Sequence, residues 1–161
     1  MSEDTGIDQK TFQSGGVATI AGSHAINDTY TAFLPALLPV LIEKFSLTNS
    51  LAGLLSVFLQ LPSLLQPIIG HLADSVNLRL VVVLAPAVTG AGMSLLSIAP
   101  SYGFLIFLLL IAGLSSASLH AIGPVMGGTI SGNKLGRGMS FWMVGGELGR
   151  TIGPLVVVSA I

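Results

Sequence analysis

Residues 80–133 read LVVVLAPAVTGAGMSLLSIAPSYGFLIFLLLIAGLSSASLHAIGPVMGGTISGN, with no Asp, Glu, Lys or Arg between Arg79 and Lys134. Such a stretch can cross a bilayer core of about 30 Å twice, because one helical crossing takes about 20 residues. A soluble helix of this composition would have no polar face to offer water. The turn-forming segment 99–103 near its middle can separate two helices. The stretch therefore predicts two membrane-spanning helices.

The composition of the whole chain agrees with this stretch. It is 52% hydrophobic and 8% charged, with a mean hydropathy of +0.87, whereas soluble domains average roughly 25% charged residues. The chain has no cysteine, which excludes disulfides, thiolate metal sites and cysteine nucleophiles. Its formal net charge of -1 offers no basic footprint for a nucleic acid.

The apolar segments predict five helical spans, at about 17–42, 50–69, 80–98, 102–123 and 139–161. Residues 1–16 are polar and lack the features of a secretory signal, so we expect a cytoplasmic tail ahead of an uncleaved first span. The polar segment Gly70–Arg79 and the glycine-rich segment Gly127–Gly138 are expected to be loops. The strands of a β-barrel would alternate apolar and polar residues, which these spans do not. The predicted fold class is an all-α membrane protein.

Basic residues predict the orientation in the membrane. Lys10, Arg79, Lys134 and Arg137 fall on one side of the predicted spans, and only Lys44 falls on the other. Since loops rich in Lys and Arg stay in the cytoplasm, we expect a multi-pass protein of the cell (inner) membrane with a cytoplasmic N-terminus.

Two ionisable residues lie inside the first span. Asp28 falls about 11 residues into it, roughly 16 Å along a helix and close to the membrane midplane. An ionised carboxylate there costs several kcal/mol, so Asp28 should face a cavity or a partner. His24 precedes it by four residues and shares its face. The pair can bind and release protons; a purely structural hydrogen-bonded pair is the alternative.

Three further ionisable residues lie in the later spans. Glu147 and Arg150 are three positions apart, so they can pair, or Arg150 can reach Asp28 or a substrate anion with its planar guanidinium. The alternative is an ion pair that holds helices in register. His120 lies late in the fourth span, where an interfacial histidine is favoured over a proton relay. The sequence shows neither a catalytic motif nor a metal-ligand cluster, so we expect no enzyme, no metal and no cofactor.

Small residues predict where the helices pack. Gly145, Gly149 and Gly153 follow one another at four-residue intervals, and small residues let membrane helices approach closely. Pro154 removes one helical hydrogen bond and bends its helix. A packing seam alone would explain this pattern.

The segment 70–79, GHLADSVNLR, resembles the loop signature of the major facilitator superfamily. Gly70, Leu72, Ala73, Asp74 and Arg79 match the signature, whereas Ser75, Asn77 and Leu78 depart from it. We expect Asp74 to cap the start of the third span and to lock the loop in one state, because carboxylates favour helix N-termini.

Further motifs resemble the fosmidomycin-resistance branch of that superfamily. They are Ser23-His24 with Asp28 and Tyr30, Leu34-Pro35 with Leu37-Leu38-Pro39, Gln66-Pro67 with Gly70, His120, and the segment from Gly145 to Pro154. Ala121 departs from the pattern, which has proline there. Gly149, Gly153 and Pro154 also resemble the antiporter signature of the superfamily.

The resemblance implies a transporter of twelve helices in two bundles around a central cavity. The five predicted spans would be the first five helices of an N-terminal half, and a fragment is the expected explanation. The implied function is secondary active transport of a small organic solute, through proton-coupled efflux of a drug or metabolite. The alternatives are a non-transporting membrane subunit and an uptake symporter. The expected partners are the solute, protons, the bilayer, and a missing second half or a second copy.

Overall fold

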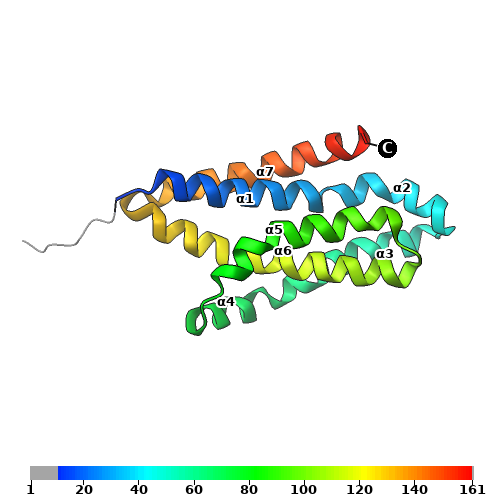
Figure 1. The fold of residues 1–161 in the computed structure, drawn as a ribbon, viewed down its shortest axis with the longest axis horizontal. Coiled ribbons are helices and arrows are strands. Elements are labelled where there is room, and N and C mark those ends of the chain that lie inside the picture. Colours follow the sequence, from blue (N-terminus) through cyan, green and yellow to red (C-terminus); the bar gives the residue numbers. More distant parts are fainter. Residues whose placement is uncertain (1–10, 161) are drawn as a thin grey trace, which may run out of the picture.

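The computed structural model describes residues 11–160, and every regular element in this range is a helix (Figure 1). The predicted all-α fold is confirmed. In chain order the elements are α1 Ser14–Thr31, α2 Phe33–Phe45, α3 Asn49–Gln60, the 3₁₀-helix η1 Leu61–Leu65, α4 Gln66–Ser75, α5 Arg79–Ser94, η2 Leu95–Ile98, α6 Tyr102–Ser131, η3 Gly132–Lys134 and α7 Leu135–Val158.

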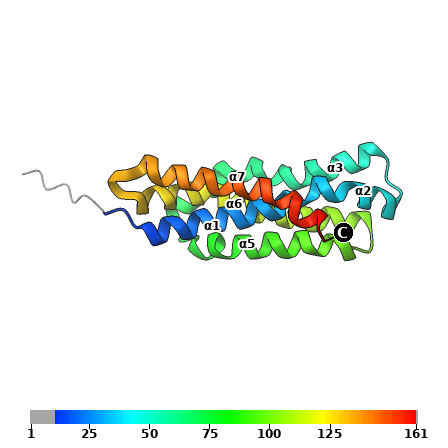
Figure 2. The same ribbon diagram turned by 90° about the horizontal axis from the view of Figure 1, so that it is seen from above.

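The helices form passes that run along the length of the molecule (Figures 1 and 2). By length and composition, four continuous helical stretches are apolar enough to cross a membrane: Ser14–Phe45, Asn49–Ser75, Arg79–Ile98 and Tyr102–Val158. The last stretch is a hairpin, in which α6 and α7 lie side by side and η3 reverses the chain. These helical stretches overlap the ranges of the five predicted spans, and the number of membrane crossings stays a prediction.

Prolines divide the first two passes into shorter helices. The first pass is interrupted at Ala32, between α1 and α2. Pro35 explains the break, because its ring would clash with the carbonyl of Thr31 in a continuous helix and it has no N–H to donate. In the second pass, η1 and α4 each begin with a proline in the first turn. Ser63 and Gln66, which line a cavity of the molecule, lie in this interrupted part of the second pass.

The helices differ from the expected segments at three places. Residues 14–16, expected in the polar tail, belong to α1. Residues 1–10 of that expected tail lie outside the described part of the chain. The expected break at Gly70–Arg79 is helical as far as Ser75. The expected loop Gly127–Gly138 is mostly helix, and only Gly132–Lys134 makes the turn.

The glycines of the segment Gly127–Gly138 serve close packing of two helices more than a loop. A Cβ atom on Gly138 would run into the hydroxyl of Ser131, so this glycine lets α6 and α7 meet. Gly132, with φ at 53°, is the residue that makes the turn, because a left-handed backbone conformation suits glycine.

The helix α7 packs along α1 through its glycines. A Cβ atom on Gly145 would lie against the carbonyl group of Ala21, and one on Gly149 would lie 2.9 Å from the backbone nitrogen of Thr29. Small residues therefore bring the two backbones together. Large apolar side chains on the outer surface, such as Leu64, Leu80 and Ile98, remain exposed, which suits a surface that faces lipid.

Candidate functional site: a cluster of ionisable groups within the helices

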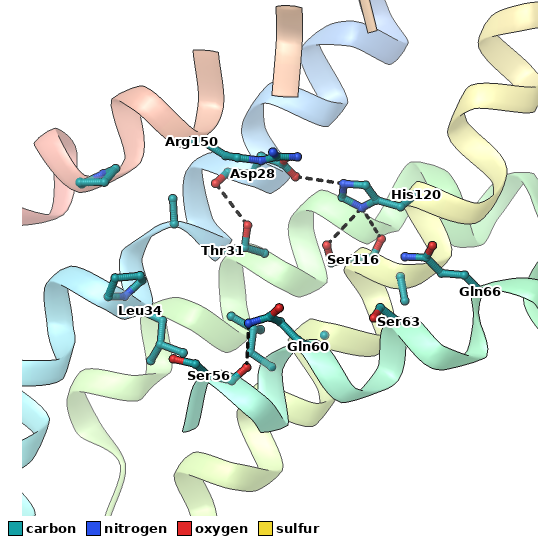
Figure 3. A pocket seen from close by; sticks show the side chains of 16 residues that line it. Asp28, Thr31, Leu34, Ser56, Gln60, Ser63, Gln66, Ser116, His120 and Arg150 are labelled. Carbon is teal, nitrogen blue, oxygen red and sulfur yellow. Dashed lines mark hydrogen bonds and ion pairs between the residues drawn. The ribbon is translucent and has the colours of Figure 1, made fainter. Parts of the chain in front are cut away.

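Asp28 of α1 is buried at the centre of a cluster drawn from three helices (Figure 3). Its Oδ2 lies 3.0 Å from Nε of Arg150, on α7, and 3.3 Å from Nε2 of His24, one turn earlier on α1. Its Oδ1 lies 3.4 Å from Nε2 of His120, on α6. The carboxylate therefore joins α1, α6 and α7.

Arg150 connects the buried carboxylate to an exposed one. Its Nη1 donates to Oε1 of Glu147 at 3.0 Å, while its Nε donates to Asp28. The side chains of Arg150 and Glu147 are 55% and 61% exposed, against 3% for Asp28. Arg150 therefore pairs with Glu147 and also reaches Asp28, the two contacts that the sequence offered as alternatives. The exposed part of the guanidinium remains open to an anion in the cavity.

His24 is held in place by Trp142 of α7. Its Nδ1 lies 2.9 Å from the backbone carbonyl oxygen of Trp142, and the two rings stack with centroids 3.8 Å apart. Gly146 leaves room for the imidazole, since a Cβ atom there would lie 2.7 Å from Nε2 of His24. The orientation of this ring is therefore set by α7.

His120 is held by its own helix. Its Nδ1 lies 2.8 Å from the backbone carbonyl oxygen of Ser116, one turn earlier on α6. Its Nε2 lies 3.1 Å from Nε2 of His24 and faces Asp28 as well. With its side chain 27% exposed, His120 lies at the boundary between the cluster and the cavity.

Asn27 is a member of the cluster that sequence reasoning missed. Its side-chain amide donates to Oδ1 of Asp28 at 3.0 Å and to the hydroxyl of Ser116 at 2.9 Å, while its own Oδ1 is buried without a hydrogen-bond partner. Its position next to Asp28, inside an otherwise apolar span, was the available signal. Trp142 offered none, because it contributes its backbone carbonyl and its ring face.

A cavity of about 560 Å³ opens beside the cluster. Asp28, His120 and Arg150 lie on one side of it, and Figure 3 shows the polar side chains of α3, η1 and α4 on the other. These are Ser56, Gln60, Ser63 and Gln66. The volume is in the range of small-molecule sites, and the walls offer a cation and several neutral hydrogen-bonding groups.

His24, Asp28 and His120 also present a set of possible metal ligands, whose ligand atoms lie within 4.8 Å of one another. The sequence did not suggest this set, because two of its members are 96 positions apart. The guanidinium of Arg150 lies 3.0 Å from the same carboxylate. A divalent cation would be repelled by this neighbouring positive charge, so the cluster suits a proton better than a metal.

The residues of the loop signature lie away from this cluster. Gly70, Asp74 and Arg79 line a separate pocket of about 300 Å³ against α6. The expected capping role of Asp74 is wrong. Asp74 lies in the last turn of α4, and the side chain of Asn77 accepts the backbone N–H of Arg79 at 3.0 Å at the start of α5. This contact is an Asx-turn, in which the side-chain oxygen of asparagine reaches a backbone N–H two residues on.

The chain is similar to known proteins over almost its whole length. Residues 20–159 match the family model of the Major Facilitator Superfamily. The chain is 30% identical over 148 residues to the fosmidomycin resistance protein of Escherichia coli (strain K12), covering 91% of this chain and 36% of that protein. It is 28% identical over 157 residues to the uncharacterized MFS-type transporter YfnC of Bacillus subtilis (strain 168), covering 93% of this chain and 38% of that protein. No solved structure matches significantly. The chain thus spans little more than a third of these relatives.

Proposed function

Because the chain belongs to the major facilitator superfamily, we propose that it works in a secondary active transporter that exports a small organic solute in exchange for protons. The observation that carries this proposal is the buried carboxylate of Asp28 beside a cavity, in contact with His24, His120 and Arg150. Ionisable groups are expensive inside a membrane and mark substrate and proton pathways.

The chemistry of the cavity suggests the class of solute. Arg150 offers a planar guanidinium suited to carboxylate or phosphonate groups. The opposite wall, with Gln60 and Gln66, can bind hydroxyl or amide groups. An anionic solute with further polar groups fits these walls. The resemblance to a fosmidomycin resistance protein supports export, as does the antiporter-like sequence of Gly149, Gly153 and Pro154.

The proposed setting is the cell membrane, with the N-terminus in the cytoplasm. The polar cavity needs a further wall if it is to be shielded from lipid. We expect that wall to come from further transporter sequence or from a second copy of the chain.

The test is a flux measurement on the complete transporter, that is, this chain together with the further sequence or second copy that closes its cavity. It is reconstituted in liposomes under an imposed pH gradient, with fosmidomycin and other small organic anions as candidate solutes. Asp28→Asn should abolish pH-driven flux while insertion and abundance stay unchanged, because the amide cannot exchange a proton. Glu43→Gln is the matched control, since Glu43 is an exposed carboxylate outside the cavity. Unchanged flux in Asp28→Asn would remove Asp28 from the mechanism, and no solute-specific flux under any gradient would contradict the transporter proposal.

A further inference from the structure

We propose that the cluster binds a single proton, shared between the facing Nε2 atoms of His24 and His120 and stabilised by Asp28. The role of this proton as the coupling proton of transport rests on the proposed function. It specifies the atoms that hold the proton and the number held. The geometry that leads to it does not depend on which solute is transported.

Two backbone carbonyls determine which nitrogen of each ring carries hydrogen. A carbonyl oxygen can only accept, so Nδ1 of His24 must donate to Trp142 and Nδ1 of His120 must donate to Ser116. The hydroxyl of Ser116 is a weaker candidate partner for His120, at 3.4 Å against 2.8 Å for the carbonyl. A neutral imidazole has only one N–H. If both rings were neutral, both Nε2 atoms would therefore carry lone pairs.

The two Nε2 atoms lie 3.1 Å apart and both face the carboxylate of Asp28, at 3.3 and 3.4 Å. Without a proton, this centre would bring lone pairs of three acceptors together and hold no hydrogen between them. One proton on either Nε2 turns the contact between the rings into a hydrogen bond and places a positive charge beside the carboxylate.

The charges of the ionisable groups also indicate that the cluster binds one proton. The titratable and charged groups that face the centre are His24 and Asp28 from α1, His120 from α6, and Arg150 from α7. The exposed Glu147 is in contact with Arg150 but does not line the cavity. The polar wall across the cavity contributes only neutral serines and glutamines. With both histidines neutral, two carboxylates and one guanidinium sum to one negative charge. One added proton balances the charge of these groups together with Glu147, and unbalanced charge is expensive within a bilayer.

The surroundings of the two rings suggest a route for the proton. His24 is 3% exposed and stacks on Trp142, and an aromatic face stabilises a neighbouring cation. His120 is partly exposed to the cavity. His24 is thus the protected side of the shared proton, and His120 is the side through which it exchanges with water.

The test is nitrogen-15 NMR of the histidine rings in the purified protein in lipid nanodiscs. The chain has three histidines, and His71→Gln removes the exposed one that lies outside the cluster, so every remaining signal comes from His24 and His120. The inference expects three ring N–H protons over the two rings: two Nδ1–H and one at Nε2. Two neutral rings with one N–H each, or two fully protonated rings, would overturn it.

A second variant checks that the proton is shared. His120→Gln in the His71→Gln background leaves His24 as the only ring that can hold the proton beside Asp28. The Nε2 chemical shift of His24 should therefore move to that of a fully protonated ring, while Nδ1 stays protonated against Trp142. An Nε2 chemical shift of His24 that is the same with and without His120 would contradict sharing. These spectra need no transport. A proton in the cluster without pH-driven flux would refute the proposed coupling alone, whereas pH-driven flux with two neutral rings would refute this inference alone.

Discussion

At the scale of single residues, Asp28 and Arg150 define the chemistry of the site. The carboxylate is buried and receives N–H donors from Arg150 and Asn27, so it is well satisfied where water is scarce. The guanidinium is shared between Asp28 and Glu147, with part of its surface left in the cavity. A solute anion that binds there would compete with two carboxylates already in contact. Substitution of Arg150 should therefore change affinity for anions in particular.

We expect Arg150→Lys to raise the KM for anionic solutes on the order of ten-fold, because a lysine keeps the charge but cannot donate in two directions from a planar fork. The measurement is the concentration dependence of flux in proteoliposomes, with a neutral solute of similar size for comparison. Arg137→Lys is the control, since Arg137 lies in the first turns of the same helix, outside the cavity, against Phe12 and Phe141. An equal loss for anionic and neutral solutes would show that Arg150 acts on structure and not on binding.

At the scale of elements, the seam between α1 and α7 holds the cluster together. Asp28 and Arg150 belong to these two helices, and the glycines of α7 allow the backbones to approach closely enough for the ion pair. The break before α2 has a local cause, Pro35, whereas the closeness of α1 and α7 depends on the absence of side chains from one face of α7. The geometry of the site thus depends on residues with no functional group.

Gly149→Ala should lower the free energy of unfolding by about 1–3 kcal/mol, because the added methyl group would be forced against the backbone of α1 in a well-packed contact. Gly136→Ala is the matched control: Gly136 lies in the same helix, and a methyl group added there would meet nothing within 4 Å. Thermal denaturation in detergent, followed by circular dichroism, would measure both. A lower melting temperature only for Gly149→Ala is expected; equal melting temperatures would show that the seam is not tightly packed.

At the scale of the whole molecule, the two ends differ. The α2–α3 and α5–α6 connections lie at one end, and the α4–α5 and α6–α7 connections lie at the other (Figure 1). Lys44 belongs to the first end, where its Nζ donates to the carbonyls of Ser97 and Ala99 and so ties α2 to the end of the third pass. Arg79, Lys134 and Arg137 belong to the second end. The positive-inside rule predicts that the second end faces the cytoplasm.

Cysteine labelling tests this orientation directly, because the chain has no cysteine of its own. Ser50 lies at the same end of the molecule as Lys44, and Ser75 lies at the same end as Arg79. Both serines are exposed and can be replaced by cysteine. In intact cells an impermeant maleimide should label the Ser50→Cys protein. The Ser75→Cys protein should react only after permeabilisation. The reverse pattern would place the N-terminus outside the cytoplasm.

Much of the molecule follows from short-range patterns in the sequence. Apolar stretches with few charges determined an all-α membrane fold, since a helix satisfies its own backbone in lipid. The pairs His24–Asp28 and Glu147–Arg150 follow from helical spacing, and the structure forms both. The motifs of the major facilitator superfamily could be recognised from the sequence because each lies within one short segment.

Only the tertiary structure decided how the two pairs meet. Asp28 and Arg150 are 122 positions apart, and His24 and His120 are 96 apart, so their contacts depend on how far the helices are shifted along one another. That shift depends on glycine contacts, which involve residues from several passes at once. The expected loop at Gly127–Gly138 failed for this reason: glycine permits a turn but equally permits close packing, and the neighbouring helix determines which of the two occurs.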